Sequence, residues 1–342
     1  TIVNMVVSIF LIYIGAGVLF VKAVATGVYM LRLVLVKIYA KRKYPALDFY
    51  AEPNEGALKQ KNAALLHQVV GIIVNNTDTT VLTICLGAKS LLEVSVYGIY
   101  MMVVNAVNQL MTSFSNGLTA GFGEVIAKNE EETLKKSYSS YEYMYFVIMF
   151  IVIACMGVLI LPFVGVYTIN LTDVQYVRPV LGILFTLIVF MQNVRIPGLT
   201  IICAAGHYKE TRYQAILEAV INITVSLGLV WKFGMAGVLL GTVCSYGYRS
   251  FEIVFYTSRH LVKGCAKKSM FRILRNVFTV AILCTVGTYV IPQEITSFTT
   301  WFLYAIGMGL TSVFLVVVIN YVVEPDEFMQ LRHRVNDIIK KE

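Results

Sequence analysis

The chain has 342 residues, of which 58% are hydrophobic and only 14% are charged, and its mean hydropathy is +0.73. Soluble globular domains of this size do not have such a composition, so we interpret the chain as an integral membrane protein. Apolar runs of about 20 residues recur along the whole length, and helices of that length satisfy their own backbone hydrogen bonds in lipid. We therefore predict an all-α fold, a polytopic transmembrane helix bundle.

Ten membrane segments are predicted in chain order, the first of them incomplete. They cover residues 1–14, 18–40, 62–86, 92–126, 141–165, 178–203, 213–231, 235–257, 272–291 and 299–322. The chain begins with Thr1 rather than Met, and the first segment is too short to span a bilayer. We expect the natural start to lie further upstream.

Positive charges fall in alternate loops. Lys and Arg cluster in residues 41–61, 128–136, 209–212, 259–272 and 332–341, whereas the other connections hold only Lys89, Arg178 and Lys232. The positive-inside rule predicts that the clusters and the C-terminus are cytoplasmic. Residues 326–341 mix apolar and charged residues and predict a short amphipathic helix at the cytoplasmic surface.

One pattern of polar residues occurs twice. Asn4, Ser8, Arg32 and Tyr39 recur, at nearly equal spacing, as Asn222, Ser226, Arg249 and Tyr256. Chance similarity between two apolar hairpins is the alternative explanation. Parallel repeats in transporters form two like halves with the substrate site between them. We therefore predict two pseudo-symmetric lobes, the N-terminal one incomplete and needing about four more helices upstream.

This plan divides the chain into five parts. They are the last two helices of the N-lobe (1–43), a cytoplasmic interlobe linker (44–61), a six-helix C-lobe (62–258), two additional transmembrane helices (259–323) and a cytoplasmic amphipathic tail (324–342).

Polar residues at bilayer depth follow helical stripes. The residues selected as site candidates are Asn75, Asp78, Asn105, Asn108, Gln109, Asn116, Gln192, Arg195, Glu218 and Arg249, together with Arg32. A charged group costs about 2.5–3.5 kcal/mol at the centre of a membrane helix, so we expect these residues to face protein or a water-filled cavity. Segments 141–165 and 299–322 are poor in such groups and are expected to face lipid. Alternatively, the stripes only join helices through hydrogen bonds, and Arg249 pairs with Glu252 on its own helix.

No soluble catalytic motif is present, and we expect no enzymatic activity, catalytic residue or cofactor. The six cysteines show no CxxC pair and no clustered spacing, so we predict neither a disulfide framework nor a metal site. A channel is disfavoured because the sequence has no pore-loop signature. A secondary transporter with two like halves fits the pattern best.

Five motifs resemble a known family. They are Val74-Asn75-Asn76-Thr77-Asp78, Ser113-Phe114-Ser115-Asn116-Gly117, Val194-Arg195-Ile196-Pro197, Ala204-Ala205-Gly206-His207-Tyr208-Lys209-Glu210-Thr211 and Glu218-Ala219-Val220-Ile221-Asn222. Together they resemble bacterial flippases of polysaccharide repeat units, the O-antigen and capsule type, in the multidrug, oligosaccharidyl-lipid and polysaccharide exporter superfamily. The resemblance covers most of the chain up to about Lys263 and suggests the last ten of fourteen helices.

The resemblance implies export of an undecaprenyl-diphosphate-linked oligosaccharide across the bacterial inner membrane by alternating access, with no nucleic-acid partner. On this hypothesis Arg32, Arg195 and Arg249 attract the diphosphate, and the Asn and Gln stripes bind sugar hydroxyls. Asp78 or Glu218 would couple transport to a proton or sodium ion. Two alternatives stay open, a cation-coupled drug exporter of the same superfamily and a membrane glycosyl polymerase or ligase acting on lipid-linked sugars.

Overall fold

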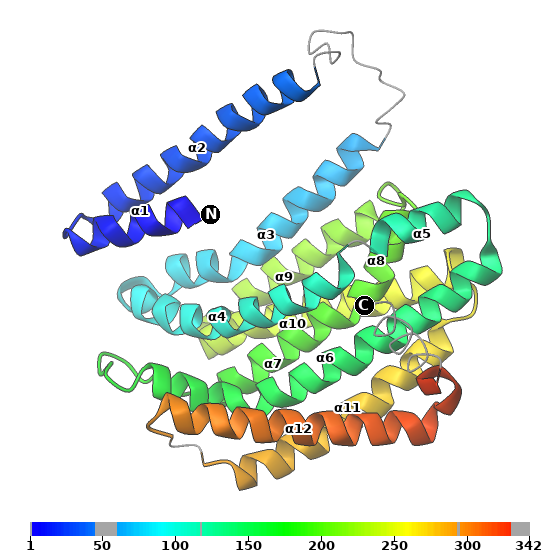
Figure 1. Cartoon of the computed structure of the whole chain (residues 1–342). Helices are drawn as coiled ribbons and strands as arrows, with labels where there is room; N and C mark the ends of the chain where they lie inside the picture. Colours follow the sequence, from blue (N-terminus) through cyan, green and yellow to red (C-terminus); the bar gives the residue numbers. More distant parts are fainter. Residues whose placement is uncertain (1, 45–59, 117, 293–294, 330–342) are drawn as a thin grey trace. The chain divides into compact units, whose positions relative to one another are not determined.

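A computed structural model describes residues 2–44, 60–116, 118–292 and 295–329. These residues form twelve α-helices and one 3-10 helix (η1), and within them there is no β-strand. The helices are α1 (Ile2–Tyr13), α2 (Val18–Lys43), α3 (Lys61–Cys85), η1 (Gly87–Lys89), α4 (Ser90–Ser115), α5 (Leu118–Ala127), α6 (Glu131–Tyr167), α7 (Pro179–Val194), α8 (Ile196–Ala204), α9 (Arg212–Phe233), α10 (Met235–His260), α11 (Ala266–Val290) and α12 (Phe298–Val323) (Figure 1). The predicted all-α fold is confirmed.

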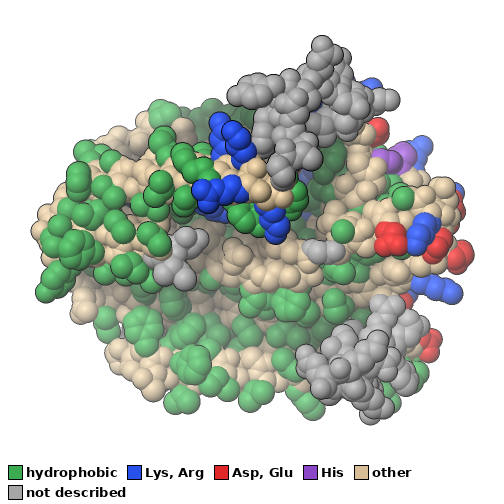
Figure 2. Space-filling model, turned by 45° about the horizontal axis from the view of Figure 1, so that its top comes forward, with side chains coloured by type: hydrophobic (Ala, Val, Ile, Leu, Met, Phe, Trp, Pro, Cys, Tyr) green, Lys and Arg blue, Asp and Glu red, His purple; other side chains and the backbone are tan. Residues whose placement is uncertain are grey.

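Among the described segments, seven are long and apolar enough to cross a membrane. They are Val18–Lys43, Gly87–Ala127, Glu131–Tyr167, Pro179–Ala204, Arg212–Phe233, Ala266–Val290 and Phe298–Val323. Figure 2 shows hydrophobic side chains spread over much of one face, with the acidic side chains gathered at the right edge of the view. The chain is therefore a multi-pass membrane protein. Helices α3 and α10, with 25 and 26 residues, are as long as most of these segments. They are less apolar because they carry the buried polar residues described below.

The chain divides into two compact units, Thr1–Lys59 and Gln60–Glu342. In the first unit, α1 and α2 form a helical hairpin whose turn contains Gly15 in the left-handed region. In the second unit, α9 and α10 form a similar hairpin, with Gly234 in the same backbone region at its turn. Most of the predicted interlobe linker and most of the predicted amphipathic tail lie outside the described residues.

Two predicted segments are interrupted. Segment 92–126 ends its first helix at Ser115, where Asn116 takes an extended conformation, because Asn-Gly sequences terminate helices. Segment 178–203 is broken at Arg195, between α7 and α8, two residues before Pro197. Proline lacks the amide hydrogen that would continue the hydrogen-bond ladder, which explains the break at this position.

The prediction that segment 141–165 faces lipid is wrong. More than half of the apolar stretch of α6 is buried, where α6 packs against α7, α11 and α12. Its buried side chains include Tyr145, Phe146 and Phe150. The absence of ionisable residues suits a protein core as well as lipid, so this pattern could not separate the two. Helix α12, by contrast, buries little of its surface.

Helices α9 and α10 approach closely through small residues. The Ser226 hydroxyl donates to the carbonyl of Val238 (3.1 Å), and the Asn222 amide donates to the Thr242 hydroxyl (3.0 Å). A Cβ atom at Gly241 would lie 2.2 Å from Ser226 Oγ and 2.7 Å from its backbone nitrogen. The repeated Asn and Ser residues therefore join helices in the second hairpin.

We expect Gly241→Ala to destabilise the protein by about 1–3 kcal/mol, because the added methyl group must push α9 away from α10. Gly247→Ala is the matched control on the same helix, since a Cβ there meets no described atom within 4 Å. It should be neutral or stabilise by up to about 1 kcal/mol. Thermal unfolding in detergent measures both, and equal melting temperatures would contradict this packing.

An ionic cluster ties α11 and α12 to α6, at the end that the charge pattern predicts to be cytoplasmic. The buried Arg272 guanidinium pairs with Glu142 (3.1 Å) and with Glu324 (3.1 Å). Lys268 donates to Glu327 (2.6 Å) in the same cluster. Burial alone would raise the pKa of Glu327, but the hydrogen bonds that Lys268 and Ser139 donate, together with the charges of Lys268 and Arg272, hold that pKa below its usual 4.5.

The Glu327→Gln variant should therefore melt below the wild-type protein at neutral pH. Because the pKa is depressed on folding, the ionised carboxylate stabilises the fold above about pH 4.5, and this contribution is lost as pH falls through the lowered pKa. The difference in melting temperature between the two proteins should shrink over that range. Glu124→Gln removes an exposed pair with Lys128 and should change little at any pH. A pH-independent difference for Glu327→Gln would refute the linkage.

Candidate functional site

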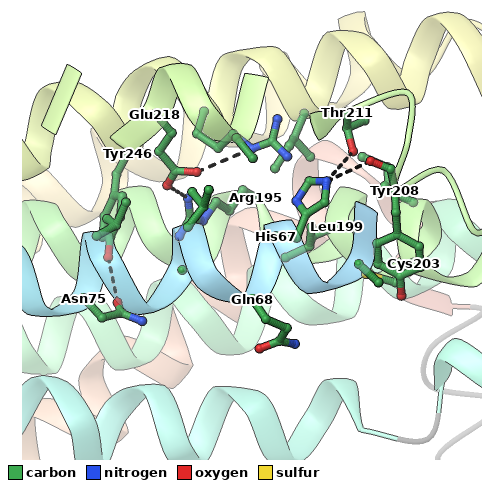
Figure 3. Close-up of a pocket in the computed structure, with 18 of the residues that line it drawn as sticks. His67, Gln68, Asn75, Arg195, Leu199, Cys203, Tyr208, Thr211, Glu218 and Tyr246 are labelled. Carbon is green, nitrogen blue, oxygen red and sulfur yellow. Dashed lines mark hydrogen bonds and ion pairs between the residues drawn. The ribbon is translucent and has the colours of Figure 1, made fainter. Parts of the chain in front are cut away.

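A cavity of about 430 Å³ lies within the second unit, between α3, α7, α8, α9 and α10 (Figure 3). Its polar and ionisable lining residues are His67, Gln68, Asn75, Gln192, Arg195, Cys203, Tyr208, Thr211, Glu218, Tyr246 and Arg249. Segments far apart in the sequence thus contribute to one chamber, and its walls carry both signs of charge.

Glu218 bridges two arginines on the cavity wall. Its Oε1 atom pairs with Arg195, and its Oε2 atom lies 3.6 Å from Arg249 Nε. Arg249 also pairs with Glu252, three residues further along α10. The side chains of Glu218 and Arg249 are only 9% and 3% exposed, so these charges rely on one another rather than on bulk water.

The break between α7 and α8 positions Arg195. Residue 195 is the junction between the two helices, which directs its side chain into the cavity beside Glu218 (Figure 3). Its guanidinium lies over the Tyr246 ring, 4.4 Å from the centroid, and the Tyr246 hydroxyl donates to Asn75 Oδ1 (3.3 Å). The Nε atom of Arg195 has no hydrogen-bond partner in the described part of the chain. This arrangement holds a cation on an aromatic face.

At the other side of the cavity, His67 contacts the turn before α9. Its Nε2 atom lies 3.0 Å from the Tyr208 carbonyl oxygen and 3.3 Å from Thr211 Oγ1 (Figure 3). These contacts join α3 to the segment between α8 and α9.

Asp78 lies outside the cavity in a buried cluster of oxygen atoms. The Thr242 hydroxyl donates to its Oδ1 (2.7 Å), and the Tyr97 hydroxyl donates to its Oδ2 (3.3 Å). Asn222, which is fully buried, donates to Thr242, and its own Oδ1 has no partner among the residues described. A buried carboxylate with neighbouring hydroxyl and amide oxygens can hold a proton or a small hard cation.

Other polar residues form a hydrogen-bonded chain behind the cavity. Asn108 donates to Gln192 Oε1 (2.9 Å), Asn193 donates to Asn108 Oδ1 (3.0 Å), and the Tyr145 hydroxyl donates to Asn193 Oδ1 (2.9 Å). This chain links α4, α6 and α7 and holds the Gln192 side chain at the cavity wall.

The structure brings together only part of the predicted site. Asn75, Gln192, Arg195, Glu218 and Arg249 line one cavity. Asn108 is connected to the cavity only through its hydrogen bond to Gln192, and Asp78 is buried outside the cavity. Asn105 and Gln109 are exposed on α4, Asn116 is exposed just after its last residue, and none of the three belongs to the cavity lining. Arg32 belongs to the first unit, so its role stays a prediction.

The sequence interpretation missed Thr242 and the contacts of His67. Thr242 precedes Ser245 and Arg249 on one helical face, at spacings of three and seven residues, and this register was the available signal. The partners of His67 are a backbone carbonyl and a threonine 144 residues away, which no local pattern reveals. The pairing of Glu218 with both arginines was likewise not predicted.

We expect Thr242→Val to destabilise the protein by about 1–3 kcal/mol, because it removes a donor from a buried carboxylate. Thr285→Val is the matched control, since that exposed hydroxyl bonds only the carbonyl of Ala281 on its own helix (2.8 Å). Thermal unfolding should show a clear shift for the first variant and little for the second. Equal shifts would mean that the Asp78 cluster contributes nothing specific.

No protein-family model matches the chain, and no curated protein is significantly similar to it.

Proposed function

We propose that the protein is a flippase that moves a lipid-linked oligosaccharide, carried on undecaprenyl diphosphate, from the cytoplasmic to the outer leaflet of a bacterial inner membrane. Transport proceeds by alternating access, and the C-terminus is cytoplasmic. The observation that carries the proposal is a pair of arginines, the partly buried Arg195 and the buried Arg249, on the wall of a cavity within the helix bundle.

The residues that line the cavity suit a substrate with an anionic headgroup and attached sugars. Guanidinium groups present a planar fork of donors that fits phosphate oxygens. Asn75 and Gln192 line the same cavity and offer amide groups suited to sugar hydroxyls. Helices such as α12 expose large apolar side chains, which suits a substrate whose lipid tail stays in the bilayer.

Asp78 supports coupling to an ion. It is buried on α3 and bonded to Thr242 on α10, so a change in its protonation or ion occupancy alters a contact between two cavity-forming helices. An ion that binds one arrangement of these helices more tightly than another shifts the balance between them.

Two other functions fit the chain less well. A cation-coupled drug exporter should have a net acidic, aromatic cavity, whereas this one contains two arginines. A polymerase or ligase of lipid-linked sugars would join repeat units, so incubating the purified protein with two labelled units distinguishes it by elongation.

The test is complementation of a bacterial strain that lacks its own flippase of polysaccharide repeat units. We expect Arg195→Ala and Asp78→Asn each to lower surface polysaccharide by about tenfold or more, since a contact to a buried charge contributes about 1.5–3 kcal/mol. Immunoblotting would measure both the polysaccharide and the amount of protein in the membrane.

Arg259→Ala is the matched control, because Arg259 is exposed beyond the cavity lining at the end of α10. It should leave surface polysaccharide near the wild-type level. Normal polysaccharide in both Arg195→Ala and Asp78→Asn, at normal protein levels, would refute the proposed function.

A further inference from the structure

We propose that a diphosphate enters the cavity by taking the place of the Glu218 carboxylate between Arg195 and Arg249, and that Glu218 takes up one proton as it is released. The proton comes from the surrounding solution through the cavity: the O–H bond of hydronium or of a buffer acid breaks as the O–H bond of the Glu218 carboxylic acid forms, and the conjugate base stays in solution. This inference rests on the proposed function, because the diphosphate is its substrate headgroup.

The first support is geometric. Glu218 directs one oxygen to each arginine, so its carboxylate already occupies the position between the two guanidinium groups. Phosphate and carboxylate oxygens compete for the same donors on arginine. A diphosphate can therefore bind both arginines directly only if Glu218 gives up at least one of them.

The second support is the balance of charge. Arg195 and Arg249 are matched by two carboxylates, Glu218 and Glu252, so the cluster is neutral when all four groups are ionised. A diphosphate ester that enters this cluster adds two negative charges to a buried site. An unpaired carboxylate there is strongly unfavourable, and protonation removes that cost.

The third support is that the two carboxylates differ in their position relative to the cavity. Glu218 lines the cavity, whereas Glu252 is absent from its lining and pairs with Arg249 along α10 itself. When Glu218 leaves, Glu252 continues to hold Arg249, and the Tyr246 ring continues to hold Arg195. The arginines thus stay in position to receive the anion.

The titratable groups around Glu218 come from each neighbouring segment. Helix α10 contributes Tyr246, Tyr248, Arg249 and Glu252, the α7–α8 junction contributes Arg195, α8 contributes Cys203, and the turn before α9 contributes Tyr208. Helix α3 contributes His67 at the cavity and Asp78 outside it. Asp78 is bonded to Thr242 and Tyr97, and His67 faces the Tyr208 carbonyl. Of the carboxylates in this set, Glu218 alone both lines the cavity and contacts Arg195.

The test is calorimetric binding of a short-chain polyprenyl-diphosphate monosaccharide to the purified full chain, in two buffers with different heats of ionisation. The phosphates of this probe are diesters, which do not titrate near neutral pH, so any proton taken up belongs to the protein. We expect uptake of about one proton per probe, and an affinity that weakens about tenfold for each unit rise in pH.

Glu218→Gln should abolish the uptake and the pH dependence, and should bind the probe at least as tightly as wild type at neutral pH. A variant that merely disrupts the fold would bind more weakly instead. Glu218→Asp restores a titratable carboxyl and should restore the uptake. Glu210→Gln, at an exposed position in the turn before α9, is the matched control and should behave as wild type.

The outcomes distinguish a failure of this inference from a failure of the proposed function on which it rests. Failure of the wild-type protein to bind the probe, or equal binding by Arg195→Ala, would contradict the proposed substrate and the inference together. Binding without proton uptake, or uptake that survives Glu218→Gln, would overturn the inference and leave the proposed function standing.

Discussion

A charged side chain at bilayer depth is stable only when it is paired or in contact with water, and the second unit of this protein is arranged around that constraint. Glu218 on α9 lies between Arg195, at the α7–α8 junction, and Arg249 on α10. This bridging joins three separate segments by charge as well as by packing. The cavity beside it gives the same groups access to a ligand.

The same cluster bears on how the two arginines would bind the proposed anionic substrate. Buried arginines suggest a site that attracts phosphate by net positive charge, but here each positive charge already has a carboxylate partner. On the exchange proposed above, selectivity would come from replacement of one anion by another between fixed donors, with Tyr246 keeping Arg195 in place. A neutral cluster of paired charges is also less costly to bury within a membrane than two cations without carboxylate partners.

The sequence was sufficient for the fold class, because length, composition and recurring apolar runs leave only a bundle of membrane helices. The break at Arg195 has a cause that can be read in the sequence, because a proline two residues later cannot continue the helix. The sequence could not decide which face of an apolar helix meets protein, so α6 was wrongly expected to face lipid. Pairings between distant segments, such as His67 with the Tyr208 carbonyl, depend on tertiary packing that helical periodicity does not contain.

The polar residues that follow one face of a helix have two different roles in this structure, and the sequence does not distinguish between them. Asn222 and Ser226 join α9 to α10, whereas Glu218, one turn earlier on α9, faces the cavity. Both uses give the same spacing of four residues, because both follow one face of a helix. Only the position of the neighbouring helices distinguishes them.

The central claim is that the charged groups at bilayer depth surround a chamber that water can enter. The most direct measurement is the reaction rate of single cysteines with a water-soluble thiosulfonate reagent in membranes. Cys203, which lines the cavity, is compared with Cys155, which lines an apolar groove between α4, α6 and α12. We predict rapid modification of Cys203 and little modification of Cys155. Equal protection of both cysteines would contradict the account.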